Sequence, residues 1–409
     1  MLFLGVDWAE AHHEVLVMDE AGRTLGRARI GDDLEGLGGL HALVGEHQDA
    51  QAPHEVVVGI ETERGLLVRG LLAAGYTVFA LNPLAVSRYR ERHAVTGAKS
   101  DAADAKVLAD LVRTDRHNHR VLVPDSELAQ ALQVLARAHQ GLIWARQRQV
   151  ATLRSALREY YPAALQAFPE LGAPEALAVL SVAPGPAAGR ALSRAKIASA
   201  LERAGRVRRI QERAQQIQQA LRERRPEAPD EVADAFAQAA LAAIRVAQTL
   251  TEQIAALEGQ MRERFERHPA AEILTSLPGL GLVLGCRVLA EFGDAPGRYA
   301  DAKGRKGYAG TAPITKASGR SRVVLARHAR NRRLADACML WAFASLTCSA
   351  GARRYYDALR SRGKTHRQAL RQLANRWVGI LHGCLERGVA YREEVAWPAP
   401  EADGLGRAA

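Results

Sequence analysis

The chain has 409 residues, 48% of them hydrophobic and 25% charged, a composition that excludes an intrinsically disordered protein. Its length exceeds what one ordinary hydrophobic core organises, so we expect two or three domains. The 56 lysines and arginines outnumber the 45 acidic residues and give a formal net charge of +11. Most of these basic residues are arginines, and one guanidinium group can bind two oxygens of a phosphate at once. The excess therefore favours nucleic-acid partners.

Membrane proteins and disulfide-rich secreted proteins are classes that the sequence does not favour. It contains no apolar run of transmembrane length, and the apolar run at residues 2–6 is too short for a signal peptide, so we expect no membrane partner. The four cysteines form no CxxC pair. We therefore predict neither a zinc site nor a disulfide framework, and we expect a reducing cytoplasm.

The N-terminal part predicts an alternating α/β fold. Apolar runs at residues 2–7, 13–18 and 24–30 predict three strands in an antiparallel meander. Helices and strands then alternate over residues 34–44, 55–61, 65–74, 77–81 and 83–93. A meander followed by this alternation is the element order of a ribonuclease H-like, or RuvC-like, fold. Trp8 could pack in the core or serve as a stacking platform for a base, and we favour the core. We expect His12 and His13 to lie at the surface.

Four carboxylates in this part are candidates for a metal site. Asp7 and Glu61 each end a predicted strand, where ligands of open α/β sheets collect. Asp101 and Asp104 lie one turn apart at the start of a predicted helix, so their carboxylates share one face. Four carboxylates in one place repel one another unless cations neutralise them, which predicts Mg²⁺, and two ions would suit phosphodiester chemistry. Each acid singly is more simply a surface or helix-capping residue; the set favours the metal site.

The middle of the chain predicts long helices. Residues 126–160 have apolar residues at helical spacing, and Arg146 and Arg154 lie on the same helix, where they could bind phosphate or simply be solvated. Residues 168–190 are rich in proline and small residues and predict a connector with at most a short helix. The 4-3-4 apolar spacing in residues 210–221 and 250–265 predicts an antiparallel helical hairpin of coiled-coil character, usable for dimerisation.

The C-terminal part contains candidates for nucleic-acid binding. Residues 274–285 have the form of a helix-hairpin-helix turn, in which Gly279 and Gly281 would let a phosphate approach the backbone, although an ordinary turn between helices would look the same. The basic side chains after it add to this interpretation, namely Lys303, Arg305 and Lys306.

A lone serine in a basic segment is a candidate nucleophile. Ser318 precedes a glycine in a polar stretch that we expect to be a loop, and Arg320 and Arg322 follow it, placed to hold a phosphate. No Ser/His/Asp hydrolase pattern surrounds it. A serine in a loop usually has no chemical role, and Ser321 lies close by, so the residues alone leave this assignment open.

These motifs together resemble one known family. Asp7, Glu61 and the segment KSDAADA at residues 99–105 look like the DEDD set of the insertion-sequence "one-ten" (IS110) family of transposases. Four further segments resemble that family's second signature domain. They are LPGLG at 277–281, GTAPITKASG at 310–319, NRRL beginning at Asn331, and NRW beginning at Asn375. The resemblance spans residues 2 to about 391.

The resemblance implies a site-specific DNA recombinase that moves its own element. It implies that a RuvC-like domain holds Mg²⁺ through Asp7, Glu61, Asp101 and Asp104, and that Ser318, preferred over Ser321 because it precedes the glycine, forms a covalent phosphoserine. The partners that it implies are donor and target DNA, a structured bridge RNA, and further copies of the chain in a dimer or tetramer, acting at the nucleoid. Acids and serine lie some two hundred residues apart, so we expect the site to assemble between domains, either of one chain or of two subunits.

The expected division has four parts: a RuvC-like domain with the long basic helix at residues 1–160, a connector and coiled-coil hairpin at 161–268, a mainly helical transposase domain at 269–395, and a flexible tail at 396–409. Two other functions stay open. A metal-dependent nuclease of the Holliday-junction type would use the acids and water only. In a non-catalytic nucleic-acid-binding protein the carboxylates would be helix caps.

Overall fold

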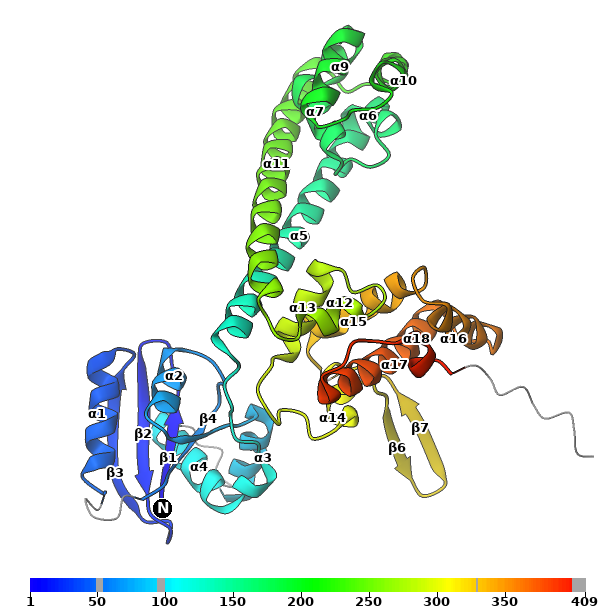
Figure 1. The fold of residues 1–409 in the computed structure, drawn as a ribbon. Helices are drawn as coiled ribbons and strands as arrows, with labels where there is room; N and C mark the ends of the chain where they lie inside the picture. Colours follow the sequence, from blue (N-terminus) through cyan, green and yellow to red (C-terminus); the bar gives the residue numbers. More distant parts are fainter. Residues whose placement is uncertain (49–53, 94–99, 329, 399–409) are drawn as a thin grey trace, which may run out of the picture. The chain divides into compact units, whose positions relative to one another are not determined.

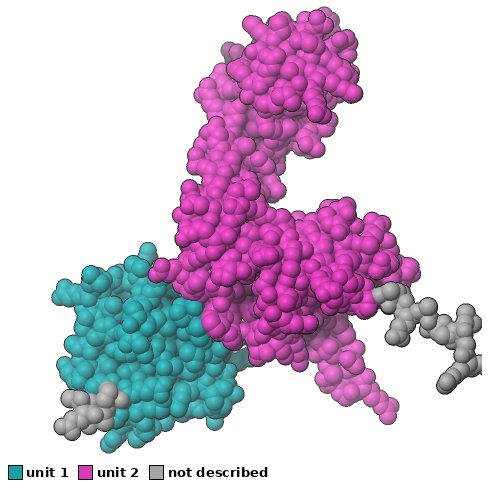
Figure 2. Space-filling view, in the orientation of Figure 1, with its two compact units in different colours: residues 1–124 teal, residues 125–409 magenta. Residues whose placement is uncertain are grey.

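The computed structural model describes residues 1–48, 54–93, 100–328 and 330–398. The chain divides into two compact units, residues 1–124 and 125–409, which Figure 2 colours teal and magenta. The long basic helix lies within the second of these compact units; the expected four-part division stays a prediction. The residues after 398 lie outside the described part of the chain, and so does Lys99.

Unit 1 is built on a five-stranded sheet, ordered β3-β2-β1-β4-β5 (Figure 1). The meander of β1, β2 and β3 is antiparallel, whereas β4 and β5 run parallel to β1. The predicted α/β pattern of this part is confirmed, with strand ends within one residue of those expected. The strands are β1 (Leu2–Asp7), β2 (His12–Met18), β3 (Thr24–Gly31), β4 (Val56–Ile60) and β5 (Thr77–Ala80).

Helices cover both faces of this sheet. Side chains alternate in direction along a strand, so Leu4 packs with α1 and α2 in one core, and the adjacent Phe3 packs with α3 and α4 in another. The sequence predicts the first three of these helices at the positions where they occur. They are α1 (Leu34–Gly45), α2 (Leu66–Ala73), α3 (Pro83–His93) and α4 (Asp101–Thr114), and the short turn η1 (Arg116–Asn118) follows.

Two glycines let α4 lie unusually close to the sheet. Gly5 of β1 and Gly59 of β4 are paired neighbours. A Cβ atom on Gly5 would lie 1.8 Å from the carbonyl oxygen of Ala105, and one on Gly59 would lie 2.6 Å from that of Leu108. No side chain fits at either position, because the backbone of α4 occupies the space. The start of α4 is thereby held against the ends of β1 and β4.

In unit 2 two long helices, α5 (Glu127–Tyr160) and α11 (Asp230–Glu266), pack along each other as an antiparallel pair (Figure 1). His139 contacts Glu258 near one end, and the ring of Tyr160 stacks on Phe236 at the other, with centroids 5.2 Å apart. The sequence predicted a different pair, residues 210–221 against 250–265. That prediction is wrong in its partner, because α10 (Ile210–Arg222) packs on the shorter helices beside it.

Those shorter helices form a compact bundle at the far end of the α5–α11 pair (Figure 1). Residues 168–190, expected to be a connector with at most a short helix, contain two helices whose side chains join a common core. The expectation is wrong because the prolines begin helices here and do not end them. The bundle consists of α6 (Pro162–Ala167), α7 (Pro174–Val182), α8 (Pro186–Ala191), α9 (Arg194–Arg203) and α10.

The rest of unit 2 is helical around a core in which the rings of Trp341 and Trp377 stack, with centroids 5.4 Å apart. Residues 396–397, expected to start a flexible tail, are packed: Trp397 is buried, and its ring contacts Trp377. The helices are α12 (Ala271–Ser276), α13 (Leu282–Phe292), α14 (Ala302–Tyr308), α15 (Arg332–Ser345), α16 (Ala350–Ser361), α17 (His366–Arg387) and α18 (Glu393–Ala396); β6 (Ile314–Ser318) and β7 (Ser321–Leu325) form a hairpin.

Among the described residues, no single helix is long and apolar enough to cross a membrane, although α15 and α16 meet the length and composition test together as a pair bent by 102°.

Candidate active site

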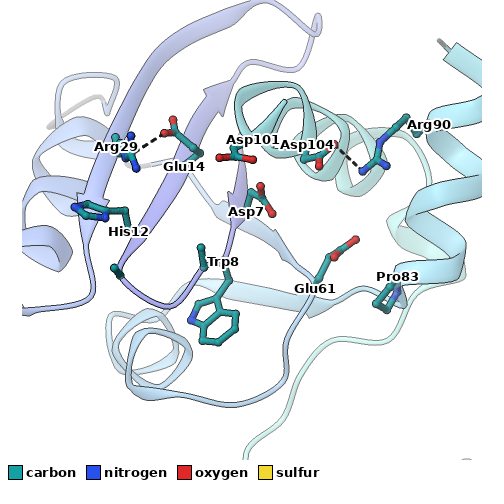
Figure 3. Close-up of a pocket in the computed structure, with 12 residues that line it drawn as sticks. Asp7, Trp8, His12, Glu14, Arg29, Glu61, Pro83, Arg90, Asp101 and Asp104 are labelled. Carbon is teal, nitrogen blue, oxygen red and sulfur yellow. Dashed lines mark ion pairs between the residues drawn. The ribbon is translucent and has the colours of Figure 1, made fainter. Parts of the chain in front are cut away.

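The four predicted acids line one pocket of about 620 Å³ in unit 1 (Figure 3). Asp7 is the last residue of β1, and Glu61 follows β4 directly. The two strands are parallel neighbours, so both acids lie at the carboxyl edge of the sheet. Asp101 and Asp104 come from the first turn of α4, which the glycine contacts hold against this edge.

Neither aspartate of α4 caps the helix. Ser100 is the N-cap residue, and its hydroxyl accepts a hydrogen bond from the backbone N–H of Ala103 at 3.3 Å. The interpretation of these carboxylates as caps therefore fails for both. They remain available to the pocket, and the positive end of the α4 dipole stabilises their negative charge.

An arginine neutralises one of the acids. Asp104 is buried, and Arg90 of α3 forms an ion pair with it at 2.6 Å (Figure 3). Glu14 and Arg29, on β2 and β3, form a second pair at 3.7 Å on the pocket wall. Asp101 and Glu61 are exposed. Five carboxylates and two arginines line the pocket, so its wall carries an excess of negative charge.

The donor set suits a hard divalent cation. Carboxylate oxygens are the ligands that Mg²⁺ prefers, and the negative excess of the pocket favours a cation over an anion. In the described part of the chain, no three side chains of the kinds that bind metals are yet arranged as a ready cage. The four acids line one pocket, and a bound cation would offset the repulsion between their charges.

Two neighbours of the site differ from their predictions. Trp8, expected in the core, is 46% exposed and lines the pocket. His13, expected at the surface, is fully buried, and its Nε2 lies 3.2 Å from a carboxylate oxygen of Asp32. The alternation along β2 decides this, because His13 points inward and His12 outward.

Ser318 lies in the other unit, on a hairpin and not in a loop. It ends β6 and pairs with Ser321 of β7, and Gly319 and Arg320 form the two-residue turn between them. Gly319 has φ +55°, the left-handed region that such turns favour. Both serines are exposed. The pocket therefore gathers the four acids within residues 1–124, and the serine belongs to residues 125–409.

The basic candidates of α14 divide into two kinds. Lys303 is exposed and Lys306 half-buried. Arg305 is buried, with its guanidinium 4.7 Å from the ring centroid of Tyr299 and 5.3 Å from that of Phe292. Burial lowers the pKa of Arg305. Arg305 is thus a core side chain, and its predicted contact with nucleic acid is not supported.

The two predicted phosphate-binding arginines of α5, Arg146 and Arg154, are half-buried and bonded within the protein. Arg146 donates a hydrogen bond to the Thr251 hydroxyl at 3.4 Å, and Arg154 donates one to the carbonyl of Pro169 at 2.6 Å. Gly279 has φ +80°, and a Cβ there would lie 2.6 Å from the backbone nitrogen of Ser345. Packing against α15 therefore already explains this glycine.

Gly281 is the N-cap of α13 and is exposed.

Unit 2 contains a buried polar cluster that the sequence does not predict. Arg137 of α5 forms two hydrogen bonds to the carboxylate of Glu291 on α13, at 2.7 and 2.8 Å. The side chain of Asn331 donates to the same carboxylate at 2.7 Å and accepts from the backbone of Leu334 at the start of α15. Glu291 thus joins three elements. Nothing in the spacing of the sequence marks it, since it is the one acidic residue of a mainly apolar helix.

Two family models match the chain, one over its N-terminal part and one over its C-terminal part. A DEDD transposase model of IS110, described as "Transposase", matches residues 4–162, and a second, described as "Transposase IS116/IS110/IS902 family", matches residues 271–357. The mini-circle putative transposase for IS117 of Streptomyces coelicolor is 45% identical over 97% of this chain and 96% of its own length. An uncharacterized 42 kDa protein of insertion element IS900 from Mycobacterium paratuberculosis is 31% identical over 95% of this chain and 97% of its own length.

Proposed function

We propose that this chain, which belongs to the IS116/IS110/IS902 family of transposases, cuts and rejoins DNA with two separate groups: a carboxylate pocket that holds Mg²⁺, and a serine that bonds covalently to the DNA. The observation that carries the proposal is the single pocket that Asp7, Glu61, Asp101 and Asp104 line together. We further propose that unit 1 is RuvC-like, supported by its strand order, β3-β2-β1-β4-β5.

The four acids are the residues that would hold the metal. Membership of a DEDD family implies dependence on a divalent cation, and the donor set fits Mg²⁺. Bound there, the cation would offset negative charge on the scissile phosphate and favour ionisation of the attacking hydroxyl. The acids give the pocket its negative charge, and the ion pair with Arg90 holds the Asp104 carboxylate in place.

Ser318 is the proposed nucleophile. Its hydroxyl oxygen attacks the phosphorus, a new Oγ–P bond forms as the P–O bond to one deoxyribose breaks, and the proton of the serine passes to the departing oxygen. The phosphoserine conserves one phosphoester bond for each bond broken, so a second strand can be joined without ATP. Its exposed position at the hairpin turn supports this role. Arg320 and Arg322 beside it are placed to offset charge on the phosphate.

The partners of the proposed reaction are donor and target DNA, a structured bridge RNA and further copies of the chain. The family supports DNA. The net charge of +11 suits an RNA as well as DNA. A dimer or tetramer would supply the several sites that strand exchange between two duplexes requires.

A matched pair of acids tests the proposal. Glu61 lines the pocket, whereas Glu63, two residues later, is exposed outside it. With DNA carrying both ends of the element and RNA transcribed from its flank, we expect Glu61→Gln to abolish Mg²⁺-dependent cleavage and Glu63→Gln to leave it unchanged. Equal activity of the two variants would overturn the metal site. Free nicked ends without a protein adduct would indicate the nuclease instead.

A further inference from the structure

The hairpin of β6 and β7 is a two-stranded ribbon that stands out from unit 2 (Figure 1). Every residue from Thr315 to Leu325 is exposed, including Val323 at 47% and Val324 at 60%. An isolated two-stranded ribbon has little stability of its own in water. The apolar side chains of this ribbon are exposed to solvent. These features are typical of a surface that is covered by a partner when the protein works.

The strand register fixes which side chains share a face. Paired residues lie on the same face, and faces alternate along each strand. Ser318 pairs with Ser321, and Lys316 pairs with Val323, so these four lie on one face. Ala317 and Arg322 form another pair and lie on the opposite face. Basic side chains therefore stand on both faces and, with Arg320, at the turn.

The charge of this segment identifies the partner. Residues 302–335 contain ten lysines and arginines and no aspartate or glutamate. A run of this kind repels a second basic copy of the same segment and attracts a polyanion with regularly spaced charges. The charge therefore favours nucleic acid over pairing of two hairpins.

The base of the ribbon is anchored, although its length is exposed. The side chain of Thr311, before β6, donates to Asn375 of α17 at 3.2 Å. After β7, the backbone N–H of Asn331 donates to the carbonyl of Tyr308 at 3.3 Å, and its side chain is held by Glu291. Both ends of the segment are thus tied to the helical body. The base of the ribbon is thus held in place, which lowers the entropic cost of positioning it on a partner.

We propose that residues 314–325 form a DNA-reading ribbon that enters the major groove, with Lys316 and Arg322 on the flanking phosphates. The major groove of B-form DNA is about 12 Å wide and admits a two-stranded β-ribbon, whereas the major groove of duplex RNA is too narrow. Val323, on the face that it shares with Ser318 and Lys316, supplies an apolar contact to thymine methyl groups. This inference rests on the proposed function only in taking DNA as the substrate; it extends that function by assigning the surface that places Ser318 on the duplex.

The test uses full-length protein carrying Ser318→Ala, so that no covalent step contributes. In this background, Lys316→Ala with Arg322→Ala removes one cation from each face. The control, Arg208→Ala with Arg224→Ala, removes two exposed cations from the helical bundle at the far end of α5 and α11. Duplex DNA from the element ends is titrated at several salt concentrations, and dimethyl sulfate reports on guanine N7, which lies in the major groove.

We expect the hairpin variant to bind duplex DNA about tenfold more weakly, with a salt slope smaller by about one for each cation removed, and to lose N7 protection. The control should retain its protection. Unchanged N7 protection in the hairpin variant would overturn the proposal, as would displacement by a minor-groove ligand or an equal loss in the control. Weakened binding to the RNA alone would assign the ribbon to RNA instead. None of these results depends on which serine is the nucleophile.

Discussion

Asp104 is the acid whose surroundings differ most from those of the other three. It is buried and paired with Arg90, whereas Asp101 and Glu61 are exposed. A buried carboxylate needs a partner, and in this structure Arg90 supplies the positive charge. The same guanidinium also limits how much negative charge the pocket offers to a cation. Arg90 is therefore expected to affect both stability and metal binding.

Replacing Arg90 with glutamine should destabilise the metal-free protein by about 3 kcal/mol, because Asp104 is left buried without its counter-ion. Mg²⁺ should then stabilise the variant more than it stabilises the wild type, since the cation replaces the missing charge. Denaturant unfolding with and without Mg²⁺ measures both effects. Arg92→Gln, an exposed neighbour on α3, is the control. If the two variants unfold alike, Arg90 does not have this role.

Gly5→Ala should destabilise the protein by about 3 kcal/mol or more, because its Cβ would collide with the backbone of α4 and push the helix off the sheet. Gly38→Ala on α1 is the contrasting change. Nothing lies within 4 Å of a Cβ there, so alanine should stabilise that helix by up to about 1 kcal/mol. Thermal unfolding of both variants compares them. A stable Gly5→Ala protein would contradict the close approach of α4.

At the scale of single residues, the sequence predicted the acids better than their surroundings. Asp7 and Glu61 could be predicted because each follows an apolar strand. The need for Gly5 could not be predicted, because it depends on a helix one hundred residues later. For Arg305 the sequence predicted the wrong environment. A basic residue in a basic segment is expected to be exposed, but Arg305 is buried against the rings of Tyr299 and Phe292.

At the scale of elements, Glu291 connects α5, α13 and the start of α15. Burial raises the pKa of this carboxyl, but hydrogen bonds from Arg137 and Asn331 outweigh burial, so its pKa lies below the usual value. A carboxyl with a lowered pKa in the folded state stabilises the protein above the pKa of the unfolded state. That contribution is lost as the pH falls through the lower, folded value.

Glu291→Gln should therefore cost about 3 kcal/mol near neutral pH, because Arg137 loses its counter-ion. The variant should also lose less stability than the wild type as the pH falls below about 4.3, the usual pKa of glutamate. Denaturant unfolding at a series of pH values measures the difference. Glu272→Gln, exposed on α12, serves as the control. A parallel pH dependence in Glu291→Gln and the wild type would contradict the assignment.

Helices were predicted more reliably than their partners. Apolar spacing shows that residues 210–221 form a helix with one apolar face, but it does not show which helix covers that face. The structure places α11 against α5. The proline-rich stretch was misjudged because Pro174 and Pro186 occupy the first positions of α7 and α8. A proline there has no N–H that the helix needs, so it begins a helix without breaking it.

At the scale of the whole molecule, the first matched family segment covers nearly all of unit 1 and continues through α5 of unit 2, whereas the second lies within unit 2. The first match covers residues 4–162 and contains all four acids; the second covers residues 271–357 and contains Ser318. The α/β and helical character of these parts could be predicted from local patterns. The serine hairpin was expected to be a loop, because its polar composition hides the strand pairing that the Gly319 turn allows.

The most direct test of the account is to identify the atom that bonds to DNA. The protein is incubated with Mg²⁺, its RNA and element-end DNA; the adduct is then denatured, treated with nuclease and digested with trypsin. Cleavage after Lys316, Arg320 and Arg322 places Ser318 and Ser321 on different peptides. We predict a phosphodeoxynucleotide on the peptide of residues 317–320, absent in Ser318→Ala. A modification on Ser321, or cleaved DNA with no modified peptide, would contradict the account.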